Sequence, residues 1–249
     1  MIEYDPVKDG MDKVFDTVKY TITKPPEFLS AYVHSFWELR TGDTLAEDFI
    51  LHAVPDACTN IMLNQMDTTI AGLIALRTRF TQLNLGKSFH FVGIQLHPGV
   101  WQDKEEPIFD SYIGRTYQGN LPLIKLSQEI KDLDFADKIP LMSVFVNDLV
   151  DSHKIKVNPI ISQILTNCDS IFTVTDMAEI ASLSARQLQR RLKQDIGLTP
   201  HDFLKILRLQ SALRAHDFLM HYTDQAHYIK EFKKMMGDSP NRFHKKYDV

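Results

Sequence analysis

The sequence predicts an α+β protein with a β-rich N-terminal domain and an all-helical C-terminal domain. In residues 1–120, short apolar runs alternate with turn residues, which is typical of a barrel or sandwich rather than of βαβ units. Residues 121–133 and 139–150 change to helical spacing of apolar positions, and the chain from residue 158 onward is helical throughout. We therefore expect a β-rich domain at 1–150, a linker at 151–157 and a helical domain at 158–249.

Composition and charge set limits on the class of protein. The chain has 249 residues, 44% of them hydrophobic, so it can form one large or two ordinary domains. It contains no apolar run of the ~18 residues that a membrane span needs, and its first residues lack the layout of a signal peptide. Cys58 and Cys168 are far apart and form no CxxC pair, so we expect free thiols in a cytoplasmic protein.

The net charge of −4 is distributed unevenly along the chain. Residues 158–249 carry 13 Lys and Arg against 10 Asp and Glu, which gives +3. Residues 1–157 carry 15 against 22, which gives −7. An acidic front and a mildly basic rear are compatible with a two-domain regulator of nucleic acid, although a charge of +3 is small.

Four strands are predicted in the N-terminal domain. Aromatic and β-branched residues place them at 32–40, 49–54, 60–63 and 89–96. The second strand runs into Pro55-Asp56-Ala57-Cys58, and the last ends at His97-Pro98-Gly99. Both of these segments contain proline next to small or polar residues, which is turn chemistry.

The C-terminal region repeats itself. Gly197-Leu198-Thr199-Pro200, followed by Phe203, recurs as Gly237-Asp238-Ser239-Pro240, followed by Phe243. The offset is 40 at each position, because 237 − 197, 240 − 200 and 243 − 203 all give this value. A period in this range usually indicates a duplicated supersecondary unit. We interpret the repeat as two helix-turn-helix units, the second unusually short.

The first unit has the order of elements that a helix-turn-helix requires. Thr175 is predicted to cap a short helix, and Ser182-Leu183-Ser184 supplies the turn, with Ser184 capping the next helix. At about 100° per residue, Leu188 and Leu192 share one face of that helix. The opposite face carries the side chains suited to base edges and phosphates, namely Arg186, Gln189, Arg190 and Lys193.

These motifs resemble the AraC family of bacterial transcription regulators. Residues 177–192 are similar to the family's first helix-turn-helix, and residues 197–213 to its central linker helix. Residues 222–234 are similar to the second recognition helix and its approach, and residues 239–243 close the signature. The resemblance covers residues 158–247, with the motifs in family order.

The N-terminal part also resembles this family, through the cupin-like domain of some of its members. The matching segments are 25–26, 35–37, 54–58 and 91–99. In the family this domain senses a ligand, mediates dimerisation, or both. The resemblance therefore implies a homodimer and a small-molecule effector, in addition to double-stranded DNA as a partner.

The resemblance also implies roles for individual residues. Arg186, Gln189 and Arg190 occupy base-reading positions, and Gln225, Ala226 and Lys230 face the groove on the second recognition helix, flanked by His227 and Lys234. Tyr228, Ile229 and Phe232 are expected in the core. The complete set of predicted DNA-binding residues is Ser184, Arg186, Gln187, Gln189, Arg190, Lys193, Gln225, Ala226, His227, Lys230 and Lys234.

The chain departs from the family pattern in two places. Ser182 stands in the turn where family members commonly have glycine, which is tolerable if its φ stays negative. The second helix-turn-helix unit is shorter by roughly ten residues than the second unit that the family resemblance implies. Either residues 217–221 form a stub scaffold helix, or the linker helix continues through Met220 and displaces the second recognition helix. The first unit is therefore expected to carry most of the DNA specificity.

Two other functions remain open at this stage. A degenerate regulator could act by protein–protein contact, because its second unit is shortened. A cupin-like metal-dependent enzyme would draw its ligands from His52, Asp56, Cys58, His90 and His97. Their spacing argues against it, since there is no His-x-His pair. The sequence also lacks a phosphate-binding loop motif, so we expect no enzyme activity, no bound metal and no cofactor.

Overall fold

Two β-sheets and eight α-helices make up the described part of the chain. The computed structural model describes residues 18–110, 114–215 and 224–246. The larger sheet has the strand order β1 (Val18–Thr23), β2 (Val33–Thr41), β7 (His90–Leu96), β4 (Thr59–Asn64), β5 (Ala71–Ile74) and β8 (Ile108–Phe109). All neighbours in it are antiparallel except β5 and β8. The smaller sheet pairs β3 (Phe49–Ala53) with β6 (Thr81–Gly86).

The central strand β7 separates two apolar layers. Because successive side chains on a strand point to opposite faces, Val92, Ile94 and Leu96 enter one core, while Phe91 enters another. Five of the seven residues of β7 are buried, as expected for a strand covered on both sides. This two-sided burial explains why residues 89–96 have the clearest strand pattern in the sequence.

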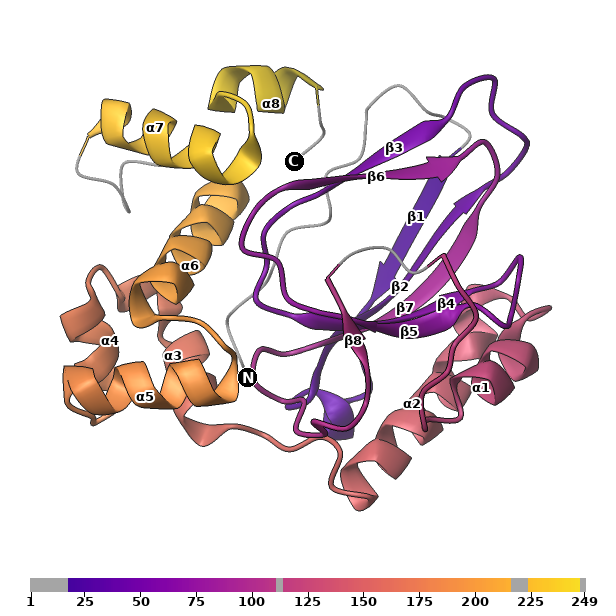
Figure 1. Ribbon diagram of the computed structural model, residues 1–249, viewed down its shortest axis with the longest axis horizontal. Helices are drawn as coiled ribbons and strands as arrows, with labels where there is room; N and C mark the ends of the chain where they lie inside the picture. Colours follow the sequence, from indigo (N-terminus) through magenta and orange to yellow (C-terminus); the bar gives the residue numbers. More distant parts are fainter. Residues whose placement is uncertain (1–17, 111–113, 216–223, 247–249) are drawn as a thin grey trace.

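Helices α1 (Leu123–Ile130) and α2 (Phe135–Asp151) cover the first of these faces (Figure 1). They contribute apolar side chains such as Leu126, Met142 and Val146 to the core beneath them. A buried charge cluster joins α2 to the sheet as well. Lys138 Nζ lies 3.3 Å from Glu38 Oε1, and His90 Nε2 lies 2.9 Å from the same oxygen.

Strands β3 and β6 lie across the second face of the large sheet. Leu51 and Leu83 from this small sheet share a core with Leu39, Met62 and Phe91 of the large one. No ladder hydrogen bonds join the two sheets among the described residues. The contact between the sheets is therefore made by side chains. These two facing sheets are the β-rich domain that the sequence predicts, and the closer likeness to a cupin stays a prediction.

The C-terminal helices form a second body beside the sheets (Figure 1). They are α3 (Pro159–Thr166), α4 (Val174–Ile180), α5 (Ala185–Asp195), α6 (Pro200–Ala215), α7 (Gln225–Met236) and α8 (Pro240–Lys246). The helix α6 runs from the α3–α5 group to the α7–α8 pair. It is buried on most sides, with residues such as Phe203, Ile206 and Leu209 in the helical core. A helix that is apolar all round is normally a central one.

The two bodies are joined by more than the chain connection. The linker itself is held against the first body, through Gln102 N–H to the Lys154 carbonyl and Lys156 N–H to the Val100 carbonyl, both at 2.9 Å. Val54, Ala57 and Cys58, from the segment after β3, lie in the same core as the C-terminal helices. Cys58 and Cys168 are both buried and form no disulfide, as predicted. Within the described residues, no helix is long and apolar enough to cross a membrane.

Candidate nucleic-acid interface

Helices α4 and α5 form the first predicted helix-turn-helix, and each begins with a capping box. Thr173 caps α4, accepting a hydrogen bond from Asp176 N–H at 3.1 Å, while the Asp176 side chain accepts from Thr173 N–H. The prediction that Thr175 is the cap was therefore wrong by two residues, because Thr175 already lies inside the helix. Ser184 caps α5 as predicted, with Gln187 as its partner.

The turn between the two helices contains a left-handed residue. Ser182 has a φ of +52°, so the condition under which serine would replace glycine at no cost, a negative φ, is not met. The chain must reverse its direction after α4, and a residue in the left-handed conformation makes this possible. Glycine adopts that conformation most easily, because it has no Cβ to clash with the backbone. Serine takes up this conformation at some cost in backbone strain.

The recognition face of α5 is exposed, and its opposite face is buried. Leu188 and Leu192 have no exposed surface and lie in the helical core. On the other side, the four predicted DNA-contacting side chains at 186, 189, 190 and 193 are all exposed. A helix whose apolar stripe is fully buried holds its polar face in a fixed orientation, so these side chains project from a rigid support.

Two of the predicted residues on α5 also have local structural roles. Gln187 Oε1 accepts a hydrogen bond from Ser184 N–H at 2.9 Å, which completes the capping box. Lys193 Nζ donates to the Gly197 carbonyl at 2.9 Å and so satisfies a carbonyl beyond the end of the helix. Arg186, Gln189 and Arg190 have no such local bond, which leaves their side chains available for a ligand.

The second predicted recognition helix, α7, also has an exposed and a buried side. Gln225, Ala226, Lys230 and Lys234 are exposed, as predicted for groove-facing residues. Tyr228 and Phe232 are buried, and burial raises the pKa of Tyr228 to about 12. The His227 side chain lies outside the described part of the structure. Residues 216–223 also lie outside it, and with them the two alternatives for the shortened scaffold helix.

Ile229 does not belong to the core of α7, contrary to the prediction. It is 40% exposed, whereas Tyr228, Phe232, Met235 and Met236 are buried. These four residues are spaced i, i+4, i+7 and i+8, which is the narrow stripe that one packed helix face can bury. Ile229 lies at the edge of this stripe, so its apolar character alone does not place it inside.

The sequence repeat corresponds to a repeated helix connection. Gly197 follows α5 with a φ of +72°, and Gly237 follows α7 with a φ of +76°. Each glycine ends its helix in the left-handed conformation, and Pro200 or Pro240 then starts the next helix three residues later. Phe203 and Phe243 are buried at the same relative position. The repeat is thus a helix–glycine–helix connection used twice.

The side chains considered as metal ligands contact other protein groups instead of converging on one site. His90 contacts Glu38, and His97 Nε2 lies 3.2 Å from the Ser30 carbonyl oxygen. The His52 ring packs on Phe80 with centroids 5.2 Å apart, and the Asp56 carboxylate accepts a hydrogen bond from Gln95 at 3.0 Å. In the described ranges, no group of three or more His, Cys, Asp or Glu side chains is arranged to hold a metal ion.

Among the buried polar residues that sequence reasoning missed, two matter most for the contacts described below. Gln210 lies in the apolar centre of α6, and Arg77 is buried in the segment between β5 and β6. A glutamine inside an otherwise apolar helical pattern is a signal for a buried hydrogen bond, so Gln210 could have been singled out. Arg77 lies in a segment of no clear periodicity and gives no such signal.

The fold and this site define a two-domain protein in which a β-rich domain precedes a helix-turn-helix domain. Comparison with protein families agrees, since residues 177–246 match a helix-turn-helix domain and residues 21–103 match a domain of unknown function (DUF6597). The helix-turn-helix match lies within the segment that resembles AraC-family regulators, and this resemblance is confirmed.

One characterised relative is similar to part of the chain. The HTH-type transcriptional regulator MtrA of Neisseria gonorrhoeae is 25% identical over 100 residues, which cover 36% of this chain and 33% of that protein. The similarity thus spans about a third of the relative's length. None of the solved structures matches the chain.

Proposed function

We propose that this protein is a sequence-specific DNA-binding transcription regulator whose helix α5 reads the major groove. The exposed face of α5 carries this proposal, because two guanidinium groups and an amide project from a helix with a buried leucine stripe. Arg donates in a bidentate manner to guanine and Gln to adenine, so this set can distinguish base pairs. The helix-turn-helix match and the transcriptional regulator to which the chain is similar support the same function.

The exposed positions on α5 and α7 also suggest which residues would contact phosphates and which would face the groove. Lys193 and Lys234 are exposed cations that would contact phosphates and position the domain, together with Ser184 and Gln187 at the start of α5. Gln225, Ala226 and Lys230 would face the groove on the second helix, with His227 and Lys234 flanking them. We further propose that the first unit carries most of the specificity, because α5 has a complete capped scaffold helix in front of it.

The proposal extends to the domains and to assembly. We assign residues 1–150 to a ligand-sensing or dimerisation domain, residues 151–157 to the linker and residues 158–249 to DNA binding. The family resemblance supports a homodimer, in which two copies would bind two half-sites separated by a whole number of helical turns. Analytical ultracentrifugation of the full chain tests this part directly, and a monomer at micromolar concentration would contradict it.

The central test begins with selection of a binding site. The full chain is used to enrich duplexes from a random-sequence library, and the affinity for the selected site is compared with that for a scrambled duplex. Arg190→Ala should lose about 1–3 kcal/mol of discrimination, roughly a 5- to 150-fold change, because it removes one base-reading side chain. Arg191→Ala is the matched control, since Arg191 lies one position along the same helix and faces Asp195 at 3.9 Å.

Two results would overturn the assignments. If Arg190→Ala discriminates between sites as well as the wild type, then α5 is not the reading helix. A footprint that spans two adjacent major grooves for each monomer would show that α7 also reads DNA, and that the first unit does not carry most of the specificity.

A further inference from the structure

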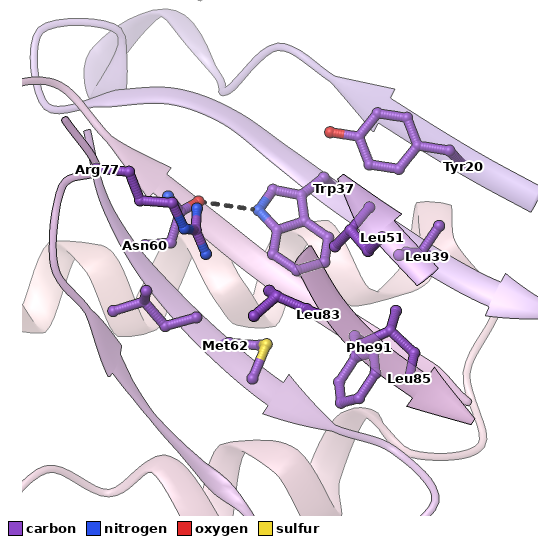
Figure 2. A pocket seen from close by; sticks show the side chains of 11 residues that line it. Tyr20, Trp37, Leu39, Leu51, Asn60, Met62, Arg77, Leu83, Leu85 and Phe91 are labelled. Atoms are coloured by element: carbon purple, nitrogen blue, oxygen red, sulfur yellow. Dashed lines mark hydrogen bonds between the residues drawn. The ribbon is translucent and has the colours of Figure 1, made fainter. Parts of the chain in front are cut away.

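The two sheets of the N-terminal domain enclose a pocket (Figure 2). The large sheet, the small sheet and the segment after β5 all contribute to its lining, which consists of Tyr20, Trp37, Leu39, Leu51, Asn60, Met62, Ile74, Arg77, Leu83, Leu85 and Phe91. Its volume of about 30 Å³ has room for roughly two waters, at ~10–15 Å³ for each. Most of the lining is apolar or aromatic, with one cationic residue.

Arg77 is that cation, and none of the residues that the structure describes supplies a counter-charge for it. Its side chain is 7% exposed, and its Nε, which has no contact with solvent, has no hydrogen-bond acceptor. No described carboxylate forms an ion pair with it. A buried charge without a partner costs several kcal/mol of folding free energy, so such a residue is rare unless it meets a ligand.

Asp56 is in backbone contact with Arg77, but its carboxylate is engaged elsewhere. The backbone N–H of Arg77 donates to the Asp56 carbonyl at 3.1 Å, which brings the two residues together through the main chain. The Asp56 carboxylate, however, accepts hydrogen bonds from Gln95 Nε2 at 3.0 Å and from Cys58 N–H at 3.3 Å. It therefore does not supply the anion that the Arg77 guanidinium lacks.

A second donor and a flat aromatic wall complete the pocket. Trp37 Nε1 donates to Asn60 Oδ1 at 3.3 Å, which fixes the amide so that its Nδ2 remains as a donor on the side of Arg77 (Figure 2). Trp37 lies over Gly93, its register partner on β7, where any Cβ would overlap the indole. The glycine thus allows the indole to lie flat against the sheet and to present a planar surface.

We propose that this pocket binds a small organic carboxylate with a planar apolar body. The carboxylate would pair with the Arg77 guanidinium in a bidentate manner and accept from Asn60 Nδ2, while the body packs on Trp37 and Phe91. Such a ligand is larger than the present cavity. The small sheet shares no ladder hydrogen bonds with the large one, so it can move outward to admit the ligand at the cost of side-chain contacts alone.

Calorimetric titration of the full chain tests the proposal, with butyrate, benzoate and phenylacetate as probes. Each acid is paired with its primary amide, which has the same shape and no charge. We expect at least one acid to bind ten-fold or more tightly than its amide. Arg77→Met should lower that affinity at least ten-fold, and Arg77→Lys should retain part of it. Arg79→Met is the matched control, because Arg79 is exposed two residues away and should bind like the wild type.

The thermal stability of the ligand-free variants separates a binding role from a structural one. Since the charge of Arg77 has no partner, Arg77→Met should keep or raise the melting temperature relative to the wild type. A lower melting temperature than that of Arg79→Met would identify Arg77 as a structural residue and overturn the proposal. The proposal also fails if no acid binds the wild type, or if the acids and amides bind equally. These measurements are made without DNA, so they can contradict the ligand proposal while the proposed DNA binding remains supported.

Discussion

The side chain of Gln210 in α6 donates a hydrogen bond to the backbone carbonyl of Pro55, over a distance of 2.5 Å. The two residues are 155 positions apart, and the bond is buried. It joins the centre of the helix-turn-helix domain to the segment that follows β3. A second bond joins the bodies nearby, from Phe80 N–H to the Met235 carbonyl at the end of α7, at 2.7 Å.

These contacts predict that the two domains stabilise each other. Gln210→Met leaves the Pro55 carbonyl buried without a donor, and should lower the free energy of unfolding by about 1–3 kcal/mol. Urea denaturation of the full chain measures this change. Gln163→Met provides the control, because Gln163 is exposed on α3 and should change stability by less than about 0.5 kcal/mol. Equal effects of the two substitutions would show that the interdomain bond contributes nothing.

The strained turn of the first helix-turn-helix predicts a stabilising substitution. A left-handed non-glycine residue costs roughly 1–2 kcal/mol, and glycine adds about 0.4–1 kcal/mol of chain entropy to the unfolded state. Ser182→Gly should therefore raise the free energy of unfolding by about 0.5–1 kcal/mol. Thermal denaturation is the measurement.

The matched control for this prediction is Ser184→Gly, two residues later. Ser184 has a φ of −68° and caps α5, so glycine relieves no strain there and removes a cap. This variant should lose a few tenths of a kcal/mol, about the difference measured between serine and glycine caps. If both substitutions destabilise the protein, the left-handed conformation of Ser182 carries no energetic cost.

The buried cluster around Glu38 predicts a stability that depends on pH. Burial by itself raises the pKa of Glu38, but the hydrogen bond from His90 and the charge of Lys138 outweigh it, so the pKa lies below its usual value of 4.5. The ionised Glu38 therefore stabilises the folded state at pH values above the usual pKa, and this stabilisation is lost as the pH falls through the lowered pKa. The wild type should lose stability between about pH 5 and the pKa of the folded state.

Glu38→Gln tests this relationship. At about pH 7 the variant leaves Lys138 buried without its counter-charge, which should cost about 3–5 kcal/mol of unfolding free energy. The difference from the wild type should shrink as the pH falls through the lowered pKa, where Glu38 becomes protonated on its own. Urea denaturation at a series of pH values from about 7 downward measures it. Glu129→Gln is the control, since Glu129 pairs with Lys125 at the surface and contributes at most about 1 kcal/mol.

Local patterns predicted those parts of the fold that depend on periodicity. The strand at 89–96 and the two faces of α5 follow from the spacing of apolar side chains, and the helix ends follow from Gly197 and Gly237. The same reasoning failed for Ile229, because burial at the edge of an apolar stripe depends on what the helix packs against. It left the conformation of Ser182 open, since the handedness of a turn is set by the two helices that it connects.

The sequence by itself determined the order of the elements, the repeated helix–glycine–helix connection and the polar face of the candidate recognition helix. These properties depend on residues within a few turns of each other, where spacing and capping chemistry act directly. Only the tertiary structure showed that Arg77 is buried without a counter-charge from the described part of the chain, and that Gln210 reaches Pro55. Both relationships arise from segments that are far apart in the chain, and burial in a shared core, rather than any local pattern, brings them together.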